Sequence, residues 1–351
     1  MTRRLLFVPA SGPRGSGEYY RCLNLARAAV VEAGRRELAL ECHVLLHSEA
    51  SVETDSALTP HTISQTPSRA SVEVSEWLTR LEPDLVAFDC SGRVRHFRQV
   101  RRQGGRVVWI SNRPGKHRRG FSPRVLPWLD GHLLADCDPG HFRRPLLARF
   151  GPAWLGRCEY LPVRLIAPTA RDPGLVLPPR FAAFVAGGGG YRHDGRPLPD
   201  ILRDAAEQFS LTTGLPSVLV TGPQYAEPMA GSERVTVLSD LPTRGLQWLL
   251  GRSMLAVTGA GYMLSSQVLT EALPAVMTPA GGRDQPGRIQ RLCAESLVMT
   301  ANPDPRALAE AAIGLYRDEG LRKRLSASIK AAGLRNAADQ AAGWLLDRMP
   351  A

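Results

Sequence analysis

The sequence predicts an α/β protein made of two doubly wound domains, each with a parallel sheet. Apolar runs that fit buried strands alternate with helical periodicity about every 30 residues, which is typical of parallel sheets with helices on both faces. The alternation occurs twice, and a stretch with five prolines and no clear period, residues 162–179, separates the halves. The 351 residues suffice for two domains. We therefore expect a domain at 1–163, a linker at 164–180, a second domain at 181–335, and a C-terminal helix at 336–351 that can pack back on the first domain.

The first half opens with a strand, a glycine-rich turn and a helix. Leu5–Pro9 is a short apolar run, residues 11–17 contain three glycines, and apolar residues recur at helical spacing over Tyr19–Ala33. Further strands are expected at Cys42–Leu46, Leu85–Phe88, Val107–Ile110, His132–Ala135 and Glu159–Pro162, and helices at Val72–Leu81 and His96–Gln103. Residues 48–70 and Asn112–Gly120 show no period and are expected to be loops, of which the second is basic.

The second half repeats this order. Phe181–Ala186 is an apolar run that leads directly into four glycines, Gly187–Gly190. The other expected strands are Ser217–Thr221, Val235–Leu238, Leu255–Thr258 and Ala275–Thr278, and the helices are Asp200–Thr212, Leu246–Leu250, Leu264–Ala272, Gln285–Glu295 and two or three closing helices that end with Asn336–Met349. Doubly wound sheets bind ligands at the carboxyl ends of their strands, and the glycine-rich turns fall there.

Composition narrows the classes of partner and compartment. The net charge of +11 fits nucleotide phosphates, an anionic membrane surface or nucleic acid, but only three of the 44 basic residues are lysine, so the arginine bias of a GC-rich genome explains it equally well. The six cysteines contain no CxxC pair, so we expect no zinc site, no disulfide framework and no cofactor. No apolar stretch approaches the ~20 residues of a membrane span. We expect a cytoplasmic bacterial protein, either free or peripheral at the inner face of the membrane.

Three glycine-rich turns are candidate anion sites, because glycine permits close approach to the backbone and a helix N-terminus offers free N–H groups. Gly15–Gly17 does not match GxGxxG, and a plain strand-to-helix turn is its alternative explanation. Gly187–Gly190 indicates that something approaches this backbone closely, with a flexible hinge as the alternative. Thr258–Gly261 also follows an apolar run, and the absence of GK[ST] argues against ATPase chemistry.

Two segments carry a resemblance to a known family. VTGAGYMLSSQVLTEALPAVMTPAGGRDQ, residues 257–285, resembles the donor-binding segment of GT-B glycosyltransferases. It is most similar to the branch that contains the N-acetylglucosaminyltransferase of peptidoglycan lipid-intermediate synthesis and the UDP-sugar hydrolase of pseudaminic acid synthesis. GSGEYYRCLNLA, residues 15–26, resembles the G-x-G-H-x-x-R-C-L-x-L-A element of that branch. The resemblance implies the GT-B fold, in which two Rossmann-like domains face a cleft, with the acceptor on the N-terminal domain and the donor on the C-terminal one.

The resemblance also implies which residues bind the donor. In this family a strand, glycine loop and helix hold the diphosphate, a helix residue holds the ribose, and a D-Q pair faces the sugar. The ribose-binding glutamate of the family falls on Gln267, whose amide offers one acceptor and one donor, and a shifted register would make Glu271 the ribose ligand instead. The candidate nucleotide-sugar-binding residues are Gly15, Ser16, Gly17, Gly187, Gly188, Gly189, Gly190, Gly259, Ala260, Gly261, Tyr262, Ser265, Gln267, Glu271, Asp284 and Gln285.

The implied reaction is the inverting, metal-independent transfer of a sugar, with a UDP-sugar as the favoured donor, by a hexosyl- or N-acetylhexosaminyltransferase. Helix N-termini can stabilise the leaving diphosphate without a metal ion. We therefore expect no metal ion to be bound by a DxD triplet. Glu18 stands where the family has a histidine and is the candidate base; the alternative is a carboxylate that only complements the helix dipole. Asp89, at a strand end, is the reserve base, or else a cap or turn residue before Ser91.

Partners and competing functions follow from the same residues. Arg113, Lys116, Arg118 and Arg119 crowd one segment of the acceptor half, where they fit an anionic acceptor, a lipid head group or a merely solvated loop. The acceptor is expected to be a small molecule, a glycan or a lipid-linked glycan. Two alternatives remain: hydrolysis or epimerisation of a UDP-sugar by the same fold, and a non-catalytic nucleotide-sugar-binding or nucleic-acid-binding protein. No nucleic-acid-binding motif supports the last of these.

Overall fold

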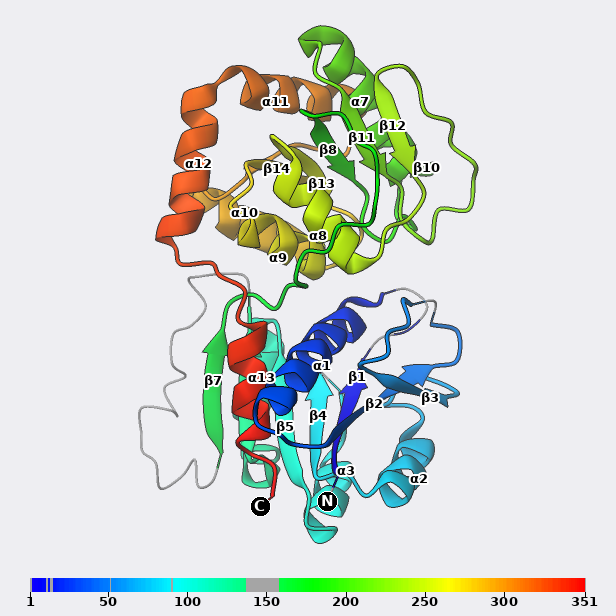
Figure 1. Ribbon diagram of the computed structural model, residues 1–351, viewed down its shortest axis with the longest axis vertical. Helices are drawn as coiled ribbons and strands as arrows, with labels where there is room; N and C mark the ends of the chain where they lie inside the picture. The colour runs from blue at the N-terminus through cyan, green and yellow to red at the C-terminus, as the bar shows by residue number, and fades with distance from the viewer. Residues whose placement is uncertain are drawn as a thin grey trace. The chain divides into compact units, whose positions relative to one another are not determined.

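The chain folds as two compact units in a computed structural model, and each unit is described separately here (Figure 1). The first unit comprises Met1–Ile166 and Asn336–Ala351, and the second comprises Ala167–Arg335. The residues that the structure describes are 2–10, 12, 15–50, 52–89, 91–136 and 158–350. Within these residues, no helix combines the length and the apolar character needed to cross a membrane.

The first unit is built on a seven-stranded parallel sheet with the order β3-β2-β1-β4-β5-β6-β7. Its strands are β1 (Arg3–Pro9), β2 (Leu40–His47), β3 (Thr59–Ile63), β4 (Leu85–Asp89), β5 (Arg106–Ser111), β6 (Gly131–Ala135) and β7 (Glu159–Val163). The chain begins at β1, runs outward to β3 and then returns to β4 on the other side of β1. This reversal of strand order opens a crevice at the carboxyl ends of β1 and β4, where doubly wound sheets bind ligands.

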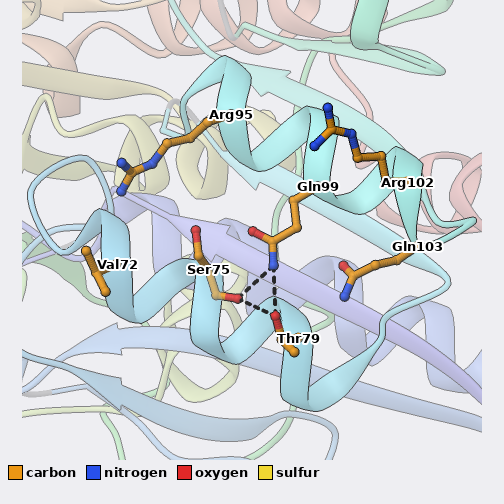
Figure 2. Close-up of a pocket in the computed structure, with 7 residues that line it drawn as sticks. All are labelled: Val72, Ser75, Thr79, Arg95, Gln99, Arg102 and Gln103. Atoms are coloured by element: carbon orange, nitrogen blue, oxygen red, sulfur yellow. Dashed lines mark hydrogen bonds between the residues drawn. The ribbon is translucent and has the colours of Figure 1, made fainter.

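Helices cover both faces of this sheet (Figure 1). They are α1 (Gly17–Arg35), α2 (Ser71–Leu81), α3 (Val94–Arg102), α4 (Pro114–Gly120), the 3₁₀ turn η1 (Leu126–Trp128) and α13 (Ala338–Leu346). On one face of the sheet, α1 and α13 share an apolar core with alternate residues of the strands. On the other face, α2 and α3 pack against the strand residues that point the opposite way. Gln99 of α3 ties these two helices together, because its Nε2 donates to the Ser75 carbonyl at 2.8 Å and to Thr79 Oγ1 at 3.0 Å (Figure 2).

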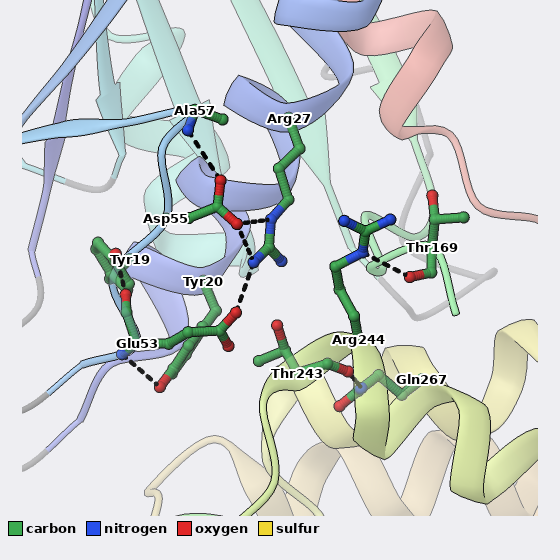
Figure 3. A network of polar contacts seen from close by, with 10 residues as sticks. All are labelled: Tyr19, Tyr20, Arg27, Glu53, Asp55, Ala57, Thr169, Thr243, Arg244 and Gln267. Carbon is green, nitrogen blue, oxygen red and sulfur yellow. Dashed lines mark hydrogen bonds and ion pairs between the residues drawn. The ribbon is translucent and has the colours of Figure 1, made fainter. Parts of the chain in front are cut away.

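The first unit also shows where the predicted loops were wrong. The long loop expected at 48–70 contains β3, an edge strand that pairs with β2 and buries only Ile63, so its sequence lacks an apolar alternation. Arg27 of α1 fastens the start of this segment, since its guanidinium bonds Glu53 at 2.5 Å and Asp55 at 2.6 Å (Figure 3). The basic loop expected at Asn112–Gly120 forms helix α4, which contains no large apolar residue to reveal its period and begins with a proline, a residue that the first helical turn tolerates.

The second unit repeats the architecture with a six-stranded parallel sheet in the order β12-β11-β8-β13-β14-β15. Its strands are β8 (Ala182–Val185), β11 (Ser217–Val220), β12 (Val235–Leu238), β13 (Ala256–Gly259), β14 (Ala275–Thr278) and β15 (Met299–Thr300), with a small ribbon of β9 (Arg192–His193) and β10 (Arg196–Pro197). The chain starts at β8, runs out through β11 to β12 and crosses back to β13. The strand-order reversal of this sheet therefore lies between β8 and β13.

Six helices of the second unit belong to the described residues. They are α7 (Leu198–Thr213), α8 (Thr243–Arg252), α9 (Tyr262–Thr270), α10 (Gln285–Ala294), α11 (Pro305–Arg317) and α12 (Glu319–Ala331). One face of the sheet, with Phe184 and Val257, shares a core with α7 and α11. The opposite face is covered by α9, whose Ser265 Oγ lies 3.7 Å from the Met277 sulfur. Both units are thus doubly wound parallel α/β domains, which confirms the predicted fold class.

The segment between the two sheets has little regular structure. Between Val163 and Ala182 there is no helix or strand, and the only regular contact is a bridge of Leu165 to Asn336. The Ala337 N–H donates to the Leu165 carbonyl at 2.8 Å. The chain therefore returns to the first unit at Asn336, which pairs with Leu165 just after β7, and continues into α13. The C-terminal helix thus belongs to the first unit.

Candidate functional site

The glycine run after β8 packs against the turn after β11. Gly189 has φ +81°, and a Cβ there would lie 2.4 Å from the Thr221 carbonyl oxygen. Gly222 has φ +91°, and a Cβ there would lie 2.1 Å from the Gly187 carbonyl oxygen. Only glycine fits such positions, because they combine a left-handed backbone with close backbone contact. The backbone that approaches Gly187–Gly190 is therefore the protein's own, and these glycines do not by themselves require a ligand.

The turn between β13 and α9 is different. Gly259 packs on Ala280, since a Cβ at Gly259 would lie 2.9 Å from the alanine Cβ. Gly261 is the N-cap of α9 with φ −62° and ψ 148°, a conformation open to any residue, and no atom of the described residues lies within 4 Å of where its Cβ would stand. Nothing in the protein's own packing explains a glycine here. The start of α9 is thus an open backbone surface at the strand-order reversal, which suits an anionic ligand.

A buried arginine that the sequence analysis missed lies behind this turn. Arg288 of α10 is only 3% exposed. Its Nη1 donates to the Ala260 carbonyl at 2.8 Å, its Nη2 bonds Asp284 Oδ2 at 2.5 Å, and its Cζ lies 5.9 Å from the centre of the Tyr262 ring. The spacing of Asp284 and Arg288, one helical turn apart, was the signal in the sequence that could have indicated the pair.

The two alternatives for the ribose ligand occupy different parts of α9. Gln267 is buried, and its Nε2 donates to the Thr243 carbonyl at the start of α8 at 3.0 Å (Figure 3). Glu271 is the C-cap of α9 and accepts a hydrogen bond from Gln247 Nε2 at 2.5 Å. Nine residues of helix separate Glu271 from Tyr262, about 14 Å along the axis. Gln267 is therefore the candidate nearer to the open start of α9.

The remaining donor-site candidates lie in two settings. Gln285 is bonded within its own turn, because its Oε1 accepts from the Ala280 N–H at 2.6 Å. Asp284 is about one-third exposed at its side chain, although one oxygen is held by Arg288. Ser265 is fully buried and faces the sheet rather than the start of the helix. Of the predicted residues, Gly261, Tyr262 and Asp284 cluster around Arg288, while Ser265 does not reach the open turn.

In the first unit, the two predicted bases have opposite environments. Glu18 lies half-buried in the first turn of α1 and forms no hydrogen bond or ion pair with any described residue. Gly15 and Gly17 beside it have no neighbour within 4 Å of an added Cβ, and Ser16 is the N-cap without a side-chain hydrogen bond. Asp89 is 0% exposed. A base must reach the acceptor hydroxyl, so Glu18 is the better placed of the two.

Asp89 instead fixes α1 to the sheet. Its two carboxylate oxygens accept from Arg21 Nε at 2.8 Å and Nη2 at 2.6 Å, and Arg21 is fully buried as well. The Cys22 thiol lies 3.7 Å from the same carboxylate, and burial together with this charge raises the pKa of Cys22. The sequence had suggested a helix cap or a turn residue as the alternative for Asp89, but Asp89 is the last residue of β4, and the N-cap of α3 is Arg93. The bidentate pair places it as a positioning residue rather than a base.

A second polar network lies at the carboxyl ends of β5 and β6 and was not predicted. His117 Nε2 lies 3.3 Å from Asp136 Oδ2, its Nδ1 lies 2.7 Å from Ser111 Oγ, and Ser111 Oγ lies 2.7 Å from His132 Nε2. A carboxylate only accepts, so His117 Nε2 donates to Asp136 Oδ2, and the Ser111 hydroxyl lies between His117 Nδ1 and His132 Nε2. Burial lowers the pKa of His132 to about 3. The network anchors α4 to the sheet, and residues up to 25 positions apart build it, which no sequence motif reveals.

The four basic candidates lie on or beside α4 rather than in a loop. Arg113, Arg118 and Arg119 are all exposed, and the Arg119 guanidinium also donates to the Gly92 carbonyl at 3.2 Å and lies 5.3 Å from the centre of the Trp109 ring. Lys116 accepts a bond from Trp109 Nε1 at its carbonyl oxygen. Arg119 is therefore partly structural, although it is as accessible to solvent as Arg113 and Arg118 are.

A groove of about 560 Å³ lies elsewhere, between α2 and α3 (Figure 2). Its lining combines polar side chains with two arginines: Val72, Ser75, Thr79, Arg95, Gln99, Arg102 and Gln103. It lies between two helices that cover a face of the sheet, away from the carboxyl ends of the strands, so it is not part of the predicted site. Among the described residues, no group of three or more His, Cys, Asp or Glu side chains could hold a metal ion.

Comparison with known proteins places the fold. No protein-family model and no curated protein matches the chain. Among solved structures, the spinosyn forosaminyltransferase SpnP is similar with a TM-score of 0.67 and 14% identity over 99% of this chain and 100% of that one. The glycosyltransferase VinC in complex with dTDP gives 0.63 and 14% identity over 99% of both chains.

An enzyme of another class shares the same architecture. A putative UDP-N-acetylglucosamine 2-epimerase from Listeria monocytogenes gives a TM-score of 0.61 and 11% identity over 99% of this chain and 95% of that one. At such identities the similarity shows the fold alone and does not single out the peptidoglycan-type branch. With two doubly wound parallel-sheet units and these neighbours over essentially its whole length, the chain has the GT-B fold.

Proposed function

We propose that the protein is a glycosyltransferase that moves a sugar from a nucleoside-diphosphate donor to an acceptor hydroxyl. The observation that carries the proposal is the open turn at Gly261, where the chain's own packing does not require a glycine and where a helix starts at the strand-order reversal. A diphosphate is the anion that such a turn holds well. Glycosyltransferases are among the solved structures of the same fold, which supports this choice of ligand.

The donor residues have distinct roles in this proposal. The Gly261 N–H and the first turn of α9 bind the diphosphate, and the turn at Gly187–Gly190 lies on the neighbouring strand β8. Gln267 binds the ribose through Oε1, because its Nε2 is already bonded to Thr243. Asp284, whose side chain is about one-third exposed, accepts a hydrogen bond from a sugar hydroxyl. A UDP-sugar is the favoured donor, and the sugar a hexose or N-acetylhexosamine.

Glu18 is the proposed base. It takes the proton of the acceptor hydroxyl while that oxygen attacks the anomeric carbon, and the bond from this carbon to the diphosphate oxygen breaks with inversion. The diphosphate leaves with its growing charge stabilised by backbone N–H groups, so the proposal needs no metal. Glu18 suits the role because it lies at a helix start with open glycines beside it and no partner among the described residues.

A ligand screen tests the proposal. The purified full-length chain is heated with UDP, dTDP, GDP, CMP or ADP and with their common sugar conjugates, and the melting temperature is recorded. Selective stabilisation by one nucleoside diphosphate is expected, since a ligand that binds only the folded state raises its stability. No stabilisation by any of them would reject the donor site.

A second assay, on the nucleotide-sugar that the screen selects, separates sugar transfer from hydrolysis or epimerisation. The stabilising nucleotide-sugar is incubated with the protein alone, and the products are followed by chromatography. A glycosyltransferase should release little sugar without an acceptor, whereas rapid release of free or epimerised sugar would assign the hydrolase or epimerase reaction instead. The epimerase among the solved structures of this fold makes that control necessary.

A further inference from the structure

Arg288 is a buried charge to which the proposed reaction gives no direct part. It lies on α10 with its side chain 4% exposed, and none of the donor contacts proposed above involves it. A buried guanidinium is retained only where its hydrogen bonds are satisfied. Here those bonds go to two parts of the candidate donor site, the Ala260 carbonyl and the Asp284 carboxylate.

The bond to Ala260 determines the orientation of one peptide group. The Ala260 N–H is fixed by the Thr278 carbonyl at 2.9 Å, and the Ala260 carbonyl is fixed by Arg288 Nη1 at 2.8 Å. In a planar trans peptide the C=O of one residue and the N–H of the next point in opposite directions. The Gly261 N–H therefore points away from Arg288, and it has no hydrogen-bond partner among the described residues.

The opposite orientation of this peptide would harm anion binding. If the Ala260–Gly261 peptide rotated by half a turn, its carbonyl oxygen would replace the N–H at the open surface and would repel a phosphate. Gly261 places little steric restriction on such a rotation, because no side chain is present and no atom lies within 4 Å of the Cβ position. The hydrogen bond from Arg288 is the interaction that opposes it.

We propose that Arg288 is a positioning residue that holds the Ala260–Gly261 peptide with its N–H toward the donor diphosphate. The inference rests on the proposed donor site. Through Nη2 the same guanidinium holds one oxygen of Asp284, so a single buried side chain orders both the phosphate turn and the sugar-facing carboxylate. Its positive charge behind the start of α9 adds to the attraction of the helix N-terminus for an anion.

The test compares three variants with the wild-type protein. Arg288→Gln removes the charge and the bond to Ala260, Arg288→Lys keeps the charge and one donor, and Gly261→Pro removes the N–H at a φ of −62° that proline adopts. Arg291→Gln, on the same helix, is the control for the change in charge. Calorimetry measures the dissociation constant of UDP, or of the diphosphate that the screen selects, and of the corresponding nucleoside.

The expected result is selective for the phosphates. Arg288→Gln and Gly261→Pro each weaken diphosphate binding by roughly tenfold or more, which is the size of a hydrogen bond to a charged group, and leave nucleoside binding unchanged. Arg288→Lys recovers part of the loss, and Arg291→Gln binds as the wild type does. In the double variant that combines Arg288→Gln with Gly261→Pro, the two losses of diphosphate affinity do not add, because both substitutions act through the Gly261 N–H.

Each outcome bears on one claim. If the wild-type protein binds no nucleoside diphosphate, the proposed function fails. If the wild type binds and Arg288→Gln binds equally well, or if the losses add in full in the double variant, the positioning role is overturned while the donor site stands. Should Arg288→Gln not fold, Arg288→Lys and Gly261→Pro decide the question, since full diphosphate affinity in both would contradict it.

Discussion

Helices α1 and α9 both start at a glycine-rich turn beside the strand-order reversal of their own sheet, but the charges at the two starts differ. The first turn of α1 carries Glu18, whereas the first turn of α9 has no acidic residue and has the buried Arg288 behind it. A helix N-terminus attracts an anion, and in α1 that position already holds a carboxylate of the chain itself. In the proposed function, the same local motif presents a base in the first unit and receives an anionic ligand in the second.

The largest expected effect is on the transfer rate and comes from removing the charge of Glu18, in the first turn of α1. Glu18→Gln should lower the transfer rate by about 10²–10⁴-fold, the usual contribution of a general base, and should leave diphosphate binding unchanged. Initial rates and calorimetry measure the two quantities. Glu32→Gln, at the other end of α1, is the matched control because it changes the same charge away from the turn. An unaltered rate in Glu18→Gln would leave Glu18 as a carboxylate that only complements the helix dipole.

Glycines at the two kinds of turn should respond differently to an added methyl group. Gly222→Ala places a Cβ against the Gly187 carbonyl in a left-handed backbone, so we expect a loss of about 3–5 kcal/mol in the free energy of unfolding. Urea denaturation of the purified variant measures it. A stable Gly222→Ala protein would show that the β8 and β11 turns are packed less closely than the structure has them.

Gly261→Ala should behave in the opposite way. Its Cβ meets no atom of the described residues and its φ of −62° suits alanine, so the free energy of unfolding should change by at most about 1 kcal/mol, because alanine restricts the unfolded chain but is a poorer N-cap than glycine. Diphosphate binding should nevertheless weaken by roughly tenfold, or about 1.4 kcal/mol, because the methyl group occupies the surface that the ligand approaches. Unchanged binding in this variant would remove the observation on which the donor site rests.

This contrast marks how far the sequence alone could lead. Apolar periodicity predicted both sheets, and it failed at β3 and α4, which bury too few apolar side chains to show a period. The glycine-rich turns were visible as well. Their cause was not, because whether Gly189 serves packing or a ligand depends on Gly222, which a turn elsewhere in the chain brings against it.

Polar pairs over long separations were equally hidden. Arg21 and Asp89 are 68 residues apart, and Arg288 and Ala260 are 28 apart. A residue type alone does not say which partner it finds, so the sequence left Asp89 as a reserve base, a cap or a turn residue and did not reveal its bidentate pair with Arg21. The position of Gln267 relative to Glu271 became clear only when α8 was placed beside α9.

The smallest expected effect concerns acid stability, which should again differ between the units. Burial lowers the pKa of His132 to about 3 and lowers those of His43, His61 and His96, all in the first unit. Between pH 6.5 and about 3 the unfolded chain takes up a proton at His132 that the folded chain refuses, so stability falls as pH falls through this window.

His132→Phe isolates this contribution, since it removes the titrating group and keeps a ring against Gly120. The free energy of unfolding of the variant should depend less steeply on pH than that of the wild type, by at most about 1.4 kcal/mol per pH unit between pH 6 and 4. His193→Phe, the same substitution in the second unit, is the control. Denaturation curves across this range measure both. Equal slopes for His132→Phe and the wild type would mean that the folded and unfolded chains take up this proton alike, and burial would then not lower the pKa of His132.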